Sequence, residues 1–208
     1  MATAPPFDLN ALKRDWIEGV SGPAFYKRVQ RRMTQIKVAG DDAYARGVMI
    51  LERDPLRFAS AFFAAVYMRV PVIVANPKWR RLEWEEVVRL VNPAVIFGNS
   101  PISAQARAGI RNPKPATILV PTGGSSGGVK FVIHRWETLT ASCEGLCSFI
   151  GPGPINSCCV LPLFHVSGLM QLVRSFVSEG RIAFPAFQDI QSGKFPDFEV
   201  GSMCISLV

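Results

Sequence analysis

The chain has 208 residues, of which 49% are hydrophobic and 19% charged, and its formal net charge at pH 7 is +7. This balance predicts a packed globular protein and excludes an intrinsically disordered one. The longest apolar run, residues 58–68, is shorter than the roughly 20 residues that a membrane-spanning helix needs. We therefore expect no membrane partner.

The positive charge raises the question of nucleic-acid binding. The basic residues are spread along the chain, and no aromatic stacking pattern accompanies them. The densest group has the spacing of one helix face: Lys27, Arg28, Arg31 and Arg32. We expect a solvated helix face and no nucleic-acid partner, with an attraction for anionic ligands as the second interpretation.

The five cysteines form no C-x-x-C pair, and an odd number argues against a disulfide framework. The two histidines, His134 and His165, have no cysteine at zinc-finger spacing. We expect reduced core thiols and no metal site within this sequence. Residues 1–16 lack the apolar segment of a signal peptide, which favours a cytoplasmic protein.

Hydrophobic periodicity predicts two helices, at residues 8–19 and 23–38, in the first part of the chain. Strands and helices then alternate: strand 48–51, helix 55–68, strand 72–74, helix 81–91 and strand 94–97. Asp54 is the expected N-cap of the helix that begins at Pro55. The fourth helix should turn these residues inward: Leu82, Val87, Leu90 and Val91. Unbroken apolar strands that alternate with helices are typical of a parallel sheet.

The second half continues the alternation: strands 117–120 and 130–134, helix 136–150, strand 158–161, helix 166–179, and strands 182–184 and 203–207. Gly180 is the expected C′ residue of the helix before it. The whole pattern predicts an α/β fold, with mostly parallel sheets flanked by helices. The apolar end of the chain, residues 204–208, predicts that the sequence is part of a longer protein.

A Gly-rich loop joins the strands at 117–120 and 130–134. Its residues are Thr122, Gly123, Gly124, Ser125, Ser126, Gly127, Gly128, Val129 and Lys130. Glycines allow backbone N–H groups to approach a ligand closely, and successive N–H groups form an anion-binding nest. The hydroxyls and Lys130 add further donors, so the loop is suited to phosphate. The alternative interpretation is a Gly/Ser hairpin loop with a solvated lysine.

Two known phosphate loops do not fit this segment. A P-loop needs lysine where Val129 stands and a hydroxyl residue after the lysine, whereas Lys130 is followed by Phe131. The dinucleotide fingerprint G-x-G-x-x-G is also absent.

The loop does resemble the phosphate loop of the adenylate-forming synthetases, the superfamily of acyl-CoA synthetases, luciferases and peptide-synthetase adenylation domains. Their pattern is Thr-Ser-Gly-Thr-Thr-Gly-x-Pro-Lys, which this chain matches in type and spacing at Thr122, Gly124, Ser125, Ser126, Gly127 and Lys130. Gly123 replaces the usual Ser, and Val129 replaces the usual Pro. The resemblance implies that hydroxyls, Lys130 and the N–H groups of Gly124, Gly127 and Gly128 hold the phosphates of ATP.

A second motif, residues 161–169, follows an expected strand and opens a helix. It resembles the Pro-Leu-Phe-His-x-x-Gly signature of acyl-CoA synthetases, in which the aromatic–His element lines the acyl pocket and the passage for the thiol. The resemblance implies that His165 acts at the catalytic centre and that Phe164, Ser167 and Gly168 contribute to the substrate pocket. Without the resemblance, a His beside a Phe is more often a packing residue.

The resemblance covers residues 51–208 and extends to the o-succinylbenzoate–CoA ligase branch, through residues 121–127, 164–168, 54–56 and 75–77. It implies activation of o-succinylbenzoate for menaquinone or phylloquinone synthesis, with ATP, coenzyme A and an aryl carboxylic acid as small-molecule partners. The second carboxylate of that acid needs a cation or several hydrogen-bond donors. Arg174 shares a helix face with Ser167 and Gln171, and it is the candidate. A surface arginine is the alternative.

The motifs for adenine, ribose, the hinge and the catalytic lysine are absent from this sequence, and Mg²⁺, which the resemblance implies, would find its ligand outside it. We therefore expect residues 1–208 to be the N-terminal portion of the large AMP-binding domain, inactive alone and without the C-terminal domain. Its expected parts are a helical lead-in (1–45), a first β/α unit (46–115) and a phosphate-loop and acyl-pocket unit (116–208). Another acyl- or aryl-CoA ligase, or a non-catalytic nucleotide-binding module, remains an alternative, and a homo-oligomer is left open.

Overall fold

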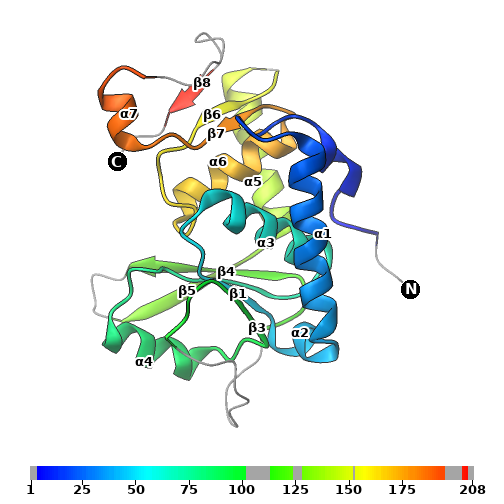
Figure 1. Ribbon diagram of the computed structural model, residues 1–208, viewed down its shortest axis with the longest axis vertical. Coiled ribbons are helices and arrows are strands. Elements are labelled where there is room, and N and C mark those ends of the chain that lie inside the picture. Colours follow the sequence, from blue (N-terminus) through cyan, green and yellow to red (C-terminus); the bar gives the residue numbers. More distant parts are fainter. Residues whose placement is uncertain (1–3, 102–112, 124–127, 152, 195–202, 206–208) are drawn as a thin grey trace. The chain divides into compact units, whose positions relative to one another are not determined.

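The computed structural model describes residues 4–101, 113–123, 128–151, 153–194 and 203–205. The chain divides into two compact units, each built from two segments. Unit 1 comprises Met1–Leu9 and Lys27–Trp136, and unit 2 comprises Asn10–Tyr26 and Glu137–Val208. Each unit contains a sheet with parallel strand pairs and helices beside it (Figure 1), which confirms the predicted α/β class.

The sheet of unit 1 has five strands in the order β3-β1-β2-β4-β5. The strands are β1 (Val48–Ile50), β2 (Val72–Val74), β3 (Val95–Phe97), β4 (Thr117–Gly123) and β5 (Val129–Arg135). All neighbours pair in parallel except β4 and β5, which form an antiparallel hairpin. Because β1 and β2 are fully buried, their continuous apolar sequences agree with strands that are covered on both faces.

Three helices lie wholly within unit 1: α2 (Asp41–Arg46), α3 (Pro55–Tyr67) and α4 (Arg81–Leu90). Helix α3 packs on β1 and β2, and it begins as predicted, with the Asp54 carboxylate accepting the Arg57 N–H at 2.7 Å. Helix α4 packs its Trp84 and Val87 into a core cluster with residues of β1, β2 and β4. Leu82 is 74% exposed and Leu90 is 44% exposed. The prediction that they face inward is therefore wrong for two of the four residues.

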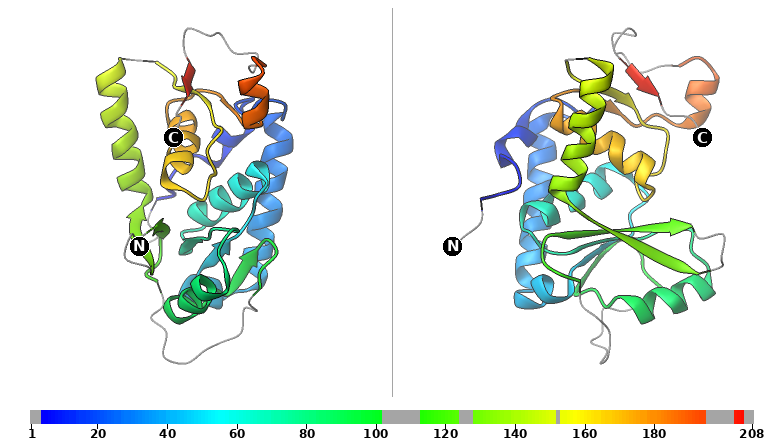
Figure 2. Two further views of the ribbon diagram at one scale, coloured as in Figure 1. Left: turned by 90° about the vertical axis from the view of Figure 1, so that its left-hand side faces the viewer. Right: turned by 180° about the vertical axis from the view of Figure 1, so that it is seen from behind.

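The sheet of unit 2 has three parallel strands in the order β7-β6-β8. They are β6 (Asn156–Cys158), β7 (Ile182–Ala183) and β8 (Met203–Ile205). Helix α6 (Val166–Val177) packs on β6 and β7. Two further helices are α5 (Trp136–Ile150), whose bounds match the prediction, and the short α7 (Phe187–Gln191), which was not predicted. Figure 2 shows α5, α6 and α7 from two further sides.

The helix predicted at residues 8–19 is wrong, because only the short 3₁₀ helix η1 (Leu9–Lys13) forms there. The following residues pair with β7 instead. The Glu18 N–H donates to the Ile182 carbonyl at 2.8 Å, and the Ile182 N–H donates to the Trp16 carbonyl at 2.7 Å. Backbone pairing to a strand far along the chain thus overrides a local helical pattern, and sequence periodicity does not contain that partner.

The predicted end of the helix at 166–179 also differs. Helix α6 ends at Val177, and the left-handed residue after it is Glu179, with φ of 61°. Gly180 is required for another reason: a Cβ there would lie 2.1 Å from the Ile155 carbonyl oxygen. Close backbone approach therefore explains this glycine, and helix capping does not.

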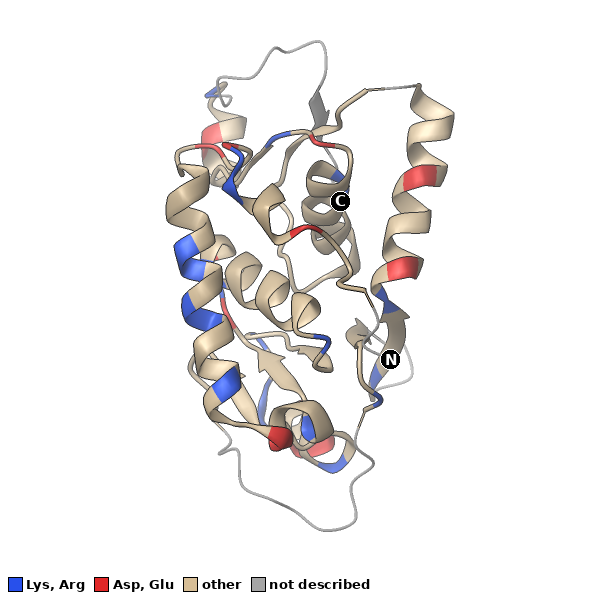
Figure 3. Cartoon of the chain, turned by 90° about the vertical axis from the view of Figure 1, so that its right-hand side faces the viewer, with Lys and Arg blue, Asp and Glu red and all other residues tan. Residues whose placement is uncertain are grey.

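Helix α1 (Gly22–Val38) carries the densest basic group on its surface (Figure 3). Lys27, Arg28 and Arg31 are exposed, as predicted, whereas Arg32 is half-buried and pairs with Glu52. None of the helices in the described part of the chain has the length and hydrophobicity of a transmembrane segment.

Candidate functional site

The Gly-rich loop connects β4 and β5 at the tip of their hairpin. Thr122 lies directly opposite Lys130 in the strand register, and Gly123 lies opposite Val129. Opposite residues of an antiparallel pair project from the same face, so the Thr122 hydroxyl and the Lys130 ammonium lie on one side of the hairpin. Both residues are exposed. Four predicted nucleotide-binding residues lie outside the described residues: Gly124, Ser125, Ser126 and Gly127.

The loop leaves β4 at the carboxyl edge of the parallel strands, because β4 runs parallel to β2. Ligands of open α/β sheets bind at this edge. The Thr122 hydroxyl donates to the Lys130 carbonyl at 3.4 Å, which ties the two ends of the loop together. The arrangement places one hydroxyl and one cation beside the Gly-rich segment, and the hydroxyl would have to turn away from the Lys130 carbonyl to donate to an anion.

Helix α4 supports the C-terminal end of the loop. The Glu86 carboxylate accepts the Val129 N–H at 2.6 Å. A Cβ on Gly128 would lie 3.1 Å from Glu86 Oε1, so the carboxylate also packs against that glycine. The sequence offered no sign of this role, since Glu86 is one of several charged residues on α4.

The second motif forms the N-terminus of α6. His165 is the N-cap residue with extended backbone, its N–H donates to the Pro162 carbonyl at 3.0 Å, and its carbonyl accepts the Leu169 N–H. The rings of Phe164 and His165 have centroids 4.7 Å apart. Phe164 is buried and His165 is exposed, so the histidine ring is accessible beside a fixed aromatic ring.

The motif glycine has a steric role. A Cβ on Gly168 would lie 2.3 Å from the Pro162 carbonyl oxygen and 2.8 Å from that of Leu161. The first turn of α6 therefore packs directly on the backbone of the preceding loop, which orients the Phe164–His165 pair.

Further along α6, polar atoms are buried without a partner. Gln171 is 2% exposed, and neither its amide nitrogen nor its amide oxygen has a hydrogen-bond partner among the described residues. The Arg174 Nε is likewise buried without a partner in that part of the chain. The next residue, Ser175, donates its hydroxyl hydrogen to the Ser157 hydroxyl at 2.8 Å. Buried polar groups are normally paired, so Gln171 and Arg174 are candidates for ligand contacts.

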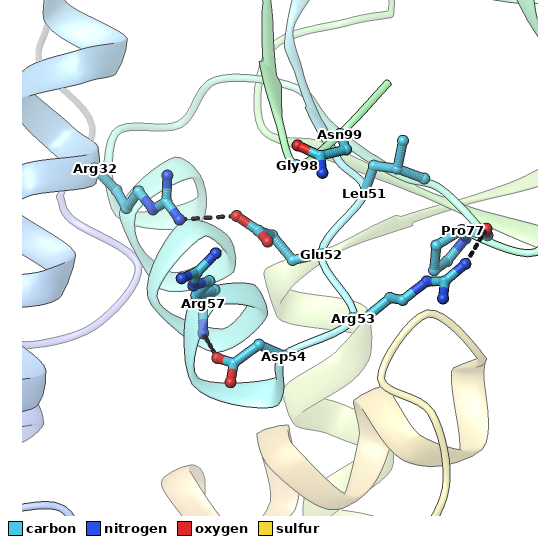
Figure 4. A pocket seen from close by; sticks show the side chains of 9 residues that line it. All are labelled: Arg32, Leu51, Glu52, Arg53, Asp54, Arg57, Pro77, Gly98 and Asn99. Carbon is cyan, nitrogen blue, oxygen red and sulfur yellow. Dashed lines mark hydrogen bonds and ion pairs between the residues drawn. The ribbon is translucent and has the colours of Figure 1, made fainter. Parts of the chain in front are cut away.

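Unit 1 also contains a polar hollow of about 620 Å³ (Figure 4). It is lined by Arg32, Leu51, Glu52, Arg53, Asp54, Arg57, Pro77, Gly98 and Asn99. It lies where the chain leaves β1 and β3, and the strand order reverses there because β2 and β3 flank β1 on opposite sides. Gly98, with φ of 113°, is required at this point because its Cβ would lie 2.2 Å from the Leu51 carbonyl oxygen.

Most charges in this hollow bind one another or the backbone. Arg32 pairs with Glu52 at 2.9 Å, and its guanidinium stacks over the Phe97 ring at 4.5 Å. Arg53 donates to the Pro77 carbonyl at 3.2 Å, and Asp54 caps α3. The hollow is therefore polar with internally paired charges. The hollow was not predicted from the sequence, although polar residues directly after apolar strands were a usable signal.

The magnesium ion that the resemblance implies would be held by one or two carboxylates together with the phosphates of ATP. No group of three or more His, Cys, Asp or Glu residues comes together in the described ranges. The carboxylate nearest the described end of the loop, Glu86, is occupied by a backbone N–H. We therefore assign no step to the metal.

Comparison with known proteins identifies the fold. The chain matches no protein-family model and no curated protein. Among solved structures it is similar to the o-succinylbenzoate coenzyme A synthetase of Bacillus subtilis in complex with ATP and magnesium, with a TM-score of 0.69 and 17% identity over 91% of this chain and 60% of that chain. A variant of E. coli MenE with bound OSB-AMS gives a TM-score of 0.69 and 20% identity over 92% of this chain and 48% of that chain.

The amide bond synthetase McbA of Marinactinospora thermotolerans gives a TM-score of 0.67 and 16% identity over 91% of this chain and 46% of that chain. The chain thus spans about half to three fifths of the length of these proteins. It has the fold of the N-terminal part of the adenylate-forming synthetases. Two of the three structures named here are o-succinylbenzoate–CoA ligases.

Three cysteines of unit 2, Cys143, Cys158 and Cys159, are buried, and Cys147 is partly buried. Burial raises the pKa of Cys143 to about 11 and that of Cys159 to about 12. Four cysteines are free in the described part of the chain: Cys143, Cys147, Cys158 and Cys159. The prediction of core thiols is therefore confirmed for Cys143, Cys158 and Cys159.

These shifts predict a loss of stability in alkali. From pH 9 to 11 the unfolded chain loses the Cys143 proton while the folded protein retains it, so the contribution of Cys143 to the unfolding free energy falls by about 1.4 kcal/mol per pH unit. Below pH 9 the contribution is constant. Urea unfolding at a series of pH values should give a shallower alkaline decline for Cys143→Ala than for the wild type. Equal declines would contradict the assignment.

The contact at Gly168 predicts a steric penalty. Gly168→Ala should lower the free energy of unfolding by about 1–3 kcal/mol, because the new methyl group meets backbone that cannot move aside easily. The matched control is Gly145→Ala on α5, where a Cβ meets nothing within 4 Å and alanine should stabilise the helix by up to about 1 kcal/mol. Thermal or urea unfolding measures both. A neutral Gly168→Ala would refute the steric explanation.

Proposed function

We propose that this chain is the N-terminal portion of an ATP-dependent acid–thiol ligase that activates o-succinylbenzoate. The observation that carries the proposal is the Gly-rich hairpin loop, with Thr122 opposite Lys130 at the carboxyl edge of the sheet. Its setting in the fold of the adenylate-forming synthetases supports ATP as the anion. The three parts proposed from the sequence, residues 1–45, 46–115 and 116–208, belong to one AMP-binding domain.

The reaction has two steps. The acid carboxylate attacks the α-phosphate of ATP, the bond to the β-phosphate breaks, and an acyl-adenylate and pyrophosphate form. The thiol of coenzyme A then attacks the acyl carbon and releases AMP. Phosphoryl chemistry of this kind depends mainly on positioning and charge stabilisation. Thr122, Lys130 and the loop N–H groups would hold the β- and γ-phosphates. ATP and coenzyme A would suit a cytoplasmic enzyme.

The second motif would form the acid site. Phe164 is fixed by burial and would pack against the aryl ring, while the accessible His165 would border the reacting carboxylate. Gly168 would act indirectly, by holding the start of α6. Gln171 and Arg174 carry the unpaired polar atoms that a second carboxylate would satisfy, because a buried carboxylate without donors is costly.

A second candidate is an adenylate-forming enzyme with a different acid or acceptor. The similarity to an amide bond synthetase, at nearly the same TM-score, favours this candidate. Substrate profiling of the full-length protein separates the two. Pyrophosphate release with o-succinylbenzoate followed by thioester formation with coenzyme A supports the first, and amide formation supports the second.

Lys130 tests the phosphate site. In the full-length protein, Lys130→Ala should reduce kcat/KM for ATP roughly tenfold to a hundredfold, since a hydrogen bond to a charged group contributes about 1.5–3 kcal/mol. Lys37→Ala, which removes an exposed lysine of α1, is the control and should leave ATP kinetics unchanged. Unchanged ATP kinetics in Lys130→Ala would refute the phosphate site.

Arg174 tests acid recognition. Arg174→Gln should raise KM for o-succinylbenzoate roughly tenfold or more through loss of a charged hydrogen bond, with little change in KM for ATP. The control is Arg181→Gln, which removes an exposed arginine of the same unit that pairs with Glu18. If Arg174→Gln changes KM for both substrates equally, or for neither, Arg174 does not recognise the acid.

A further inference from the structure

Val129, the residue before Lys130, is held by α4 in two ways. Its N–H donates to Glu86 Oε2 at 2.6 Å. Its side chain packs against the core cluster that contains Trp84 and Val87 of the same helix. One residue at the exit of the loop therefore has both a polar and an apolar attachment to one helix.

Aromatic packing strengthens the same junction. The Trp79 ring, just before α4, lies edge-on to Trp84 at 5.2 Å and to Phe131 of β5 at 6.3 Å. Figure 2 shows α4 running along the β4–β5 hairpin, and α4 contacts β5. The helix thus supports the first residues of β5 on both sides of Lys130.

The Glu86 carboxylate gives the Val129 N–H a hydrogen-bond partner that the sheet does not supply. Strand β5 lies at the edge of the sheet, where alternate N–H groups have no strand partner. The loop pattern that this chain resembles has Pro at position 129, which lacks an N–H and has a fixed φ angle. Val129, in contrast, has a backbone N–H donor and an unrestricted φ angle. Glu86 binds that donor, and Gly128 leaves room for the carboxylate.

We propose that Glu86 is a positioning residue of the phosphate loop. By binding the Val129 N–H it fixes the loop exit and holds the backbone of the adjacent Lys130 in place for an anion. Glu86 itself does not contact the nucleotide. The nucleotide arm of this inference rests on the proposed function, whereas the backbone anchor does not.

Three variants on α4 and one in the loop test the inference: Glu86→Ala, Glu86→Gln, Glu85→Ala and Val129→Pro. Glu86→Gln keeps an acceptor oxygen without the charge. Glu85→Ala is the matched control, because the neighbouring Glu85 pairs with Arg81 on the same helix. Val129→Pro removes the donor, so Glu86→Ala should have no further effect in that background.

Hydrogen exchange of the Val129 amide measures the anchor directly. Glu86→Ala should speed this exchange roughly tenfold, because a protecting hydrogen bond is lost, and should leave the Val120 amide of β4 unchanged. In the full-length protein, Glu86→Ala should raise KM for ATP roughly fivefold, as expected for one lost hydrogen bond, without changing KM for the acid. Glu86→Gln should stay near the wild type on both measures.

The outcomes separate two failures. If Val129 exchange responds to Glu86→Ala but neither Glu86→Ala nor Lys130→Ala alters ATP use, the anchor stands and the phosphate site fails. If Lys130→Ala impairs ATP use while Glu86→Ala changes neither exchange nor KM, the positioning role of Glu86 is overturned. The positioning role is also overturned if Glu86→Ala raises KM for ATP by the same factor whether position 129 is Val or Pro. Should Val129→Pro not fold, the comparison of Glu86→Ala, Glu86→Gln and Glu85→Ala decides.

Discussion

Parallel pairing of short, buried strands is the constraint on which unit 1 depends. Strands β1 and β2 have no exposed face, so their residues must be apolar and their polar neighbours must lie beyond the strand ends. Parallel register then brings the carboxyl ends of β1, β2, β3 and β4 to one edge. The Gly-rich loop and the polar hollow both lie at that edge for this reason.

The two features at the edge differ in how their charges are used. In the hollow, Arg32 and Glu52 pair with each other, and burial of both partners makes such pairing necessary. In the loop, Thr122 and Lys130 extend from the tip of an exposed hairpin, while Glu86 takes a backbone N–H. The pairs within the hollow stabilise the fold, whereas Thr122 and Lys130 are exposed to solvent.

Unit 2 illustrates how one helix can combine packing and recognition. Gly168 lets α6 approach the Leu161–Pro162 backbone closely, which fixes the start of the helix and its aromatic–histidine pair. Farther along, Gln171 is buried without a partner among the described residues. An unpaired buried amide is expensive, and such a cost is more often found at a ligand site than in a core.

Local patterns in the sequence predicted what local physics controls. The Asp54–Pro55 cap, helix α5 and the buried strands β1 and β2 each depend on residues close together in the chain, and the α/β class follows from the alternation of such elements. The helix predicted at residues 8–19 failed because Trp16 and Glu18 bond to Ile182, more than 160 residues away. Leu82 was assigned to the core by its spacing, but the larger Trp84 occupies that side of α4.

The tertiary structure alone decided which distant groups meet. The Glu86–Val129 hydrogen bond, the Gly180–Ile155 contact and the Arg32–Glu52 pair each join separate elements, and no periodicity encodes them. The sequence by itself determined the α/β fold class, because the alternation of apolar strands with helices depends on the residues of each element. It also predicted a loop suited to phosphate. The hydrogen bond from Val129 to Glu86 that supports the loop was decided by the tertiary structure, because only packing brings α4 next to β5.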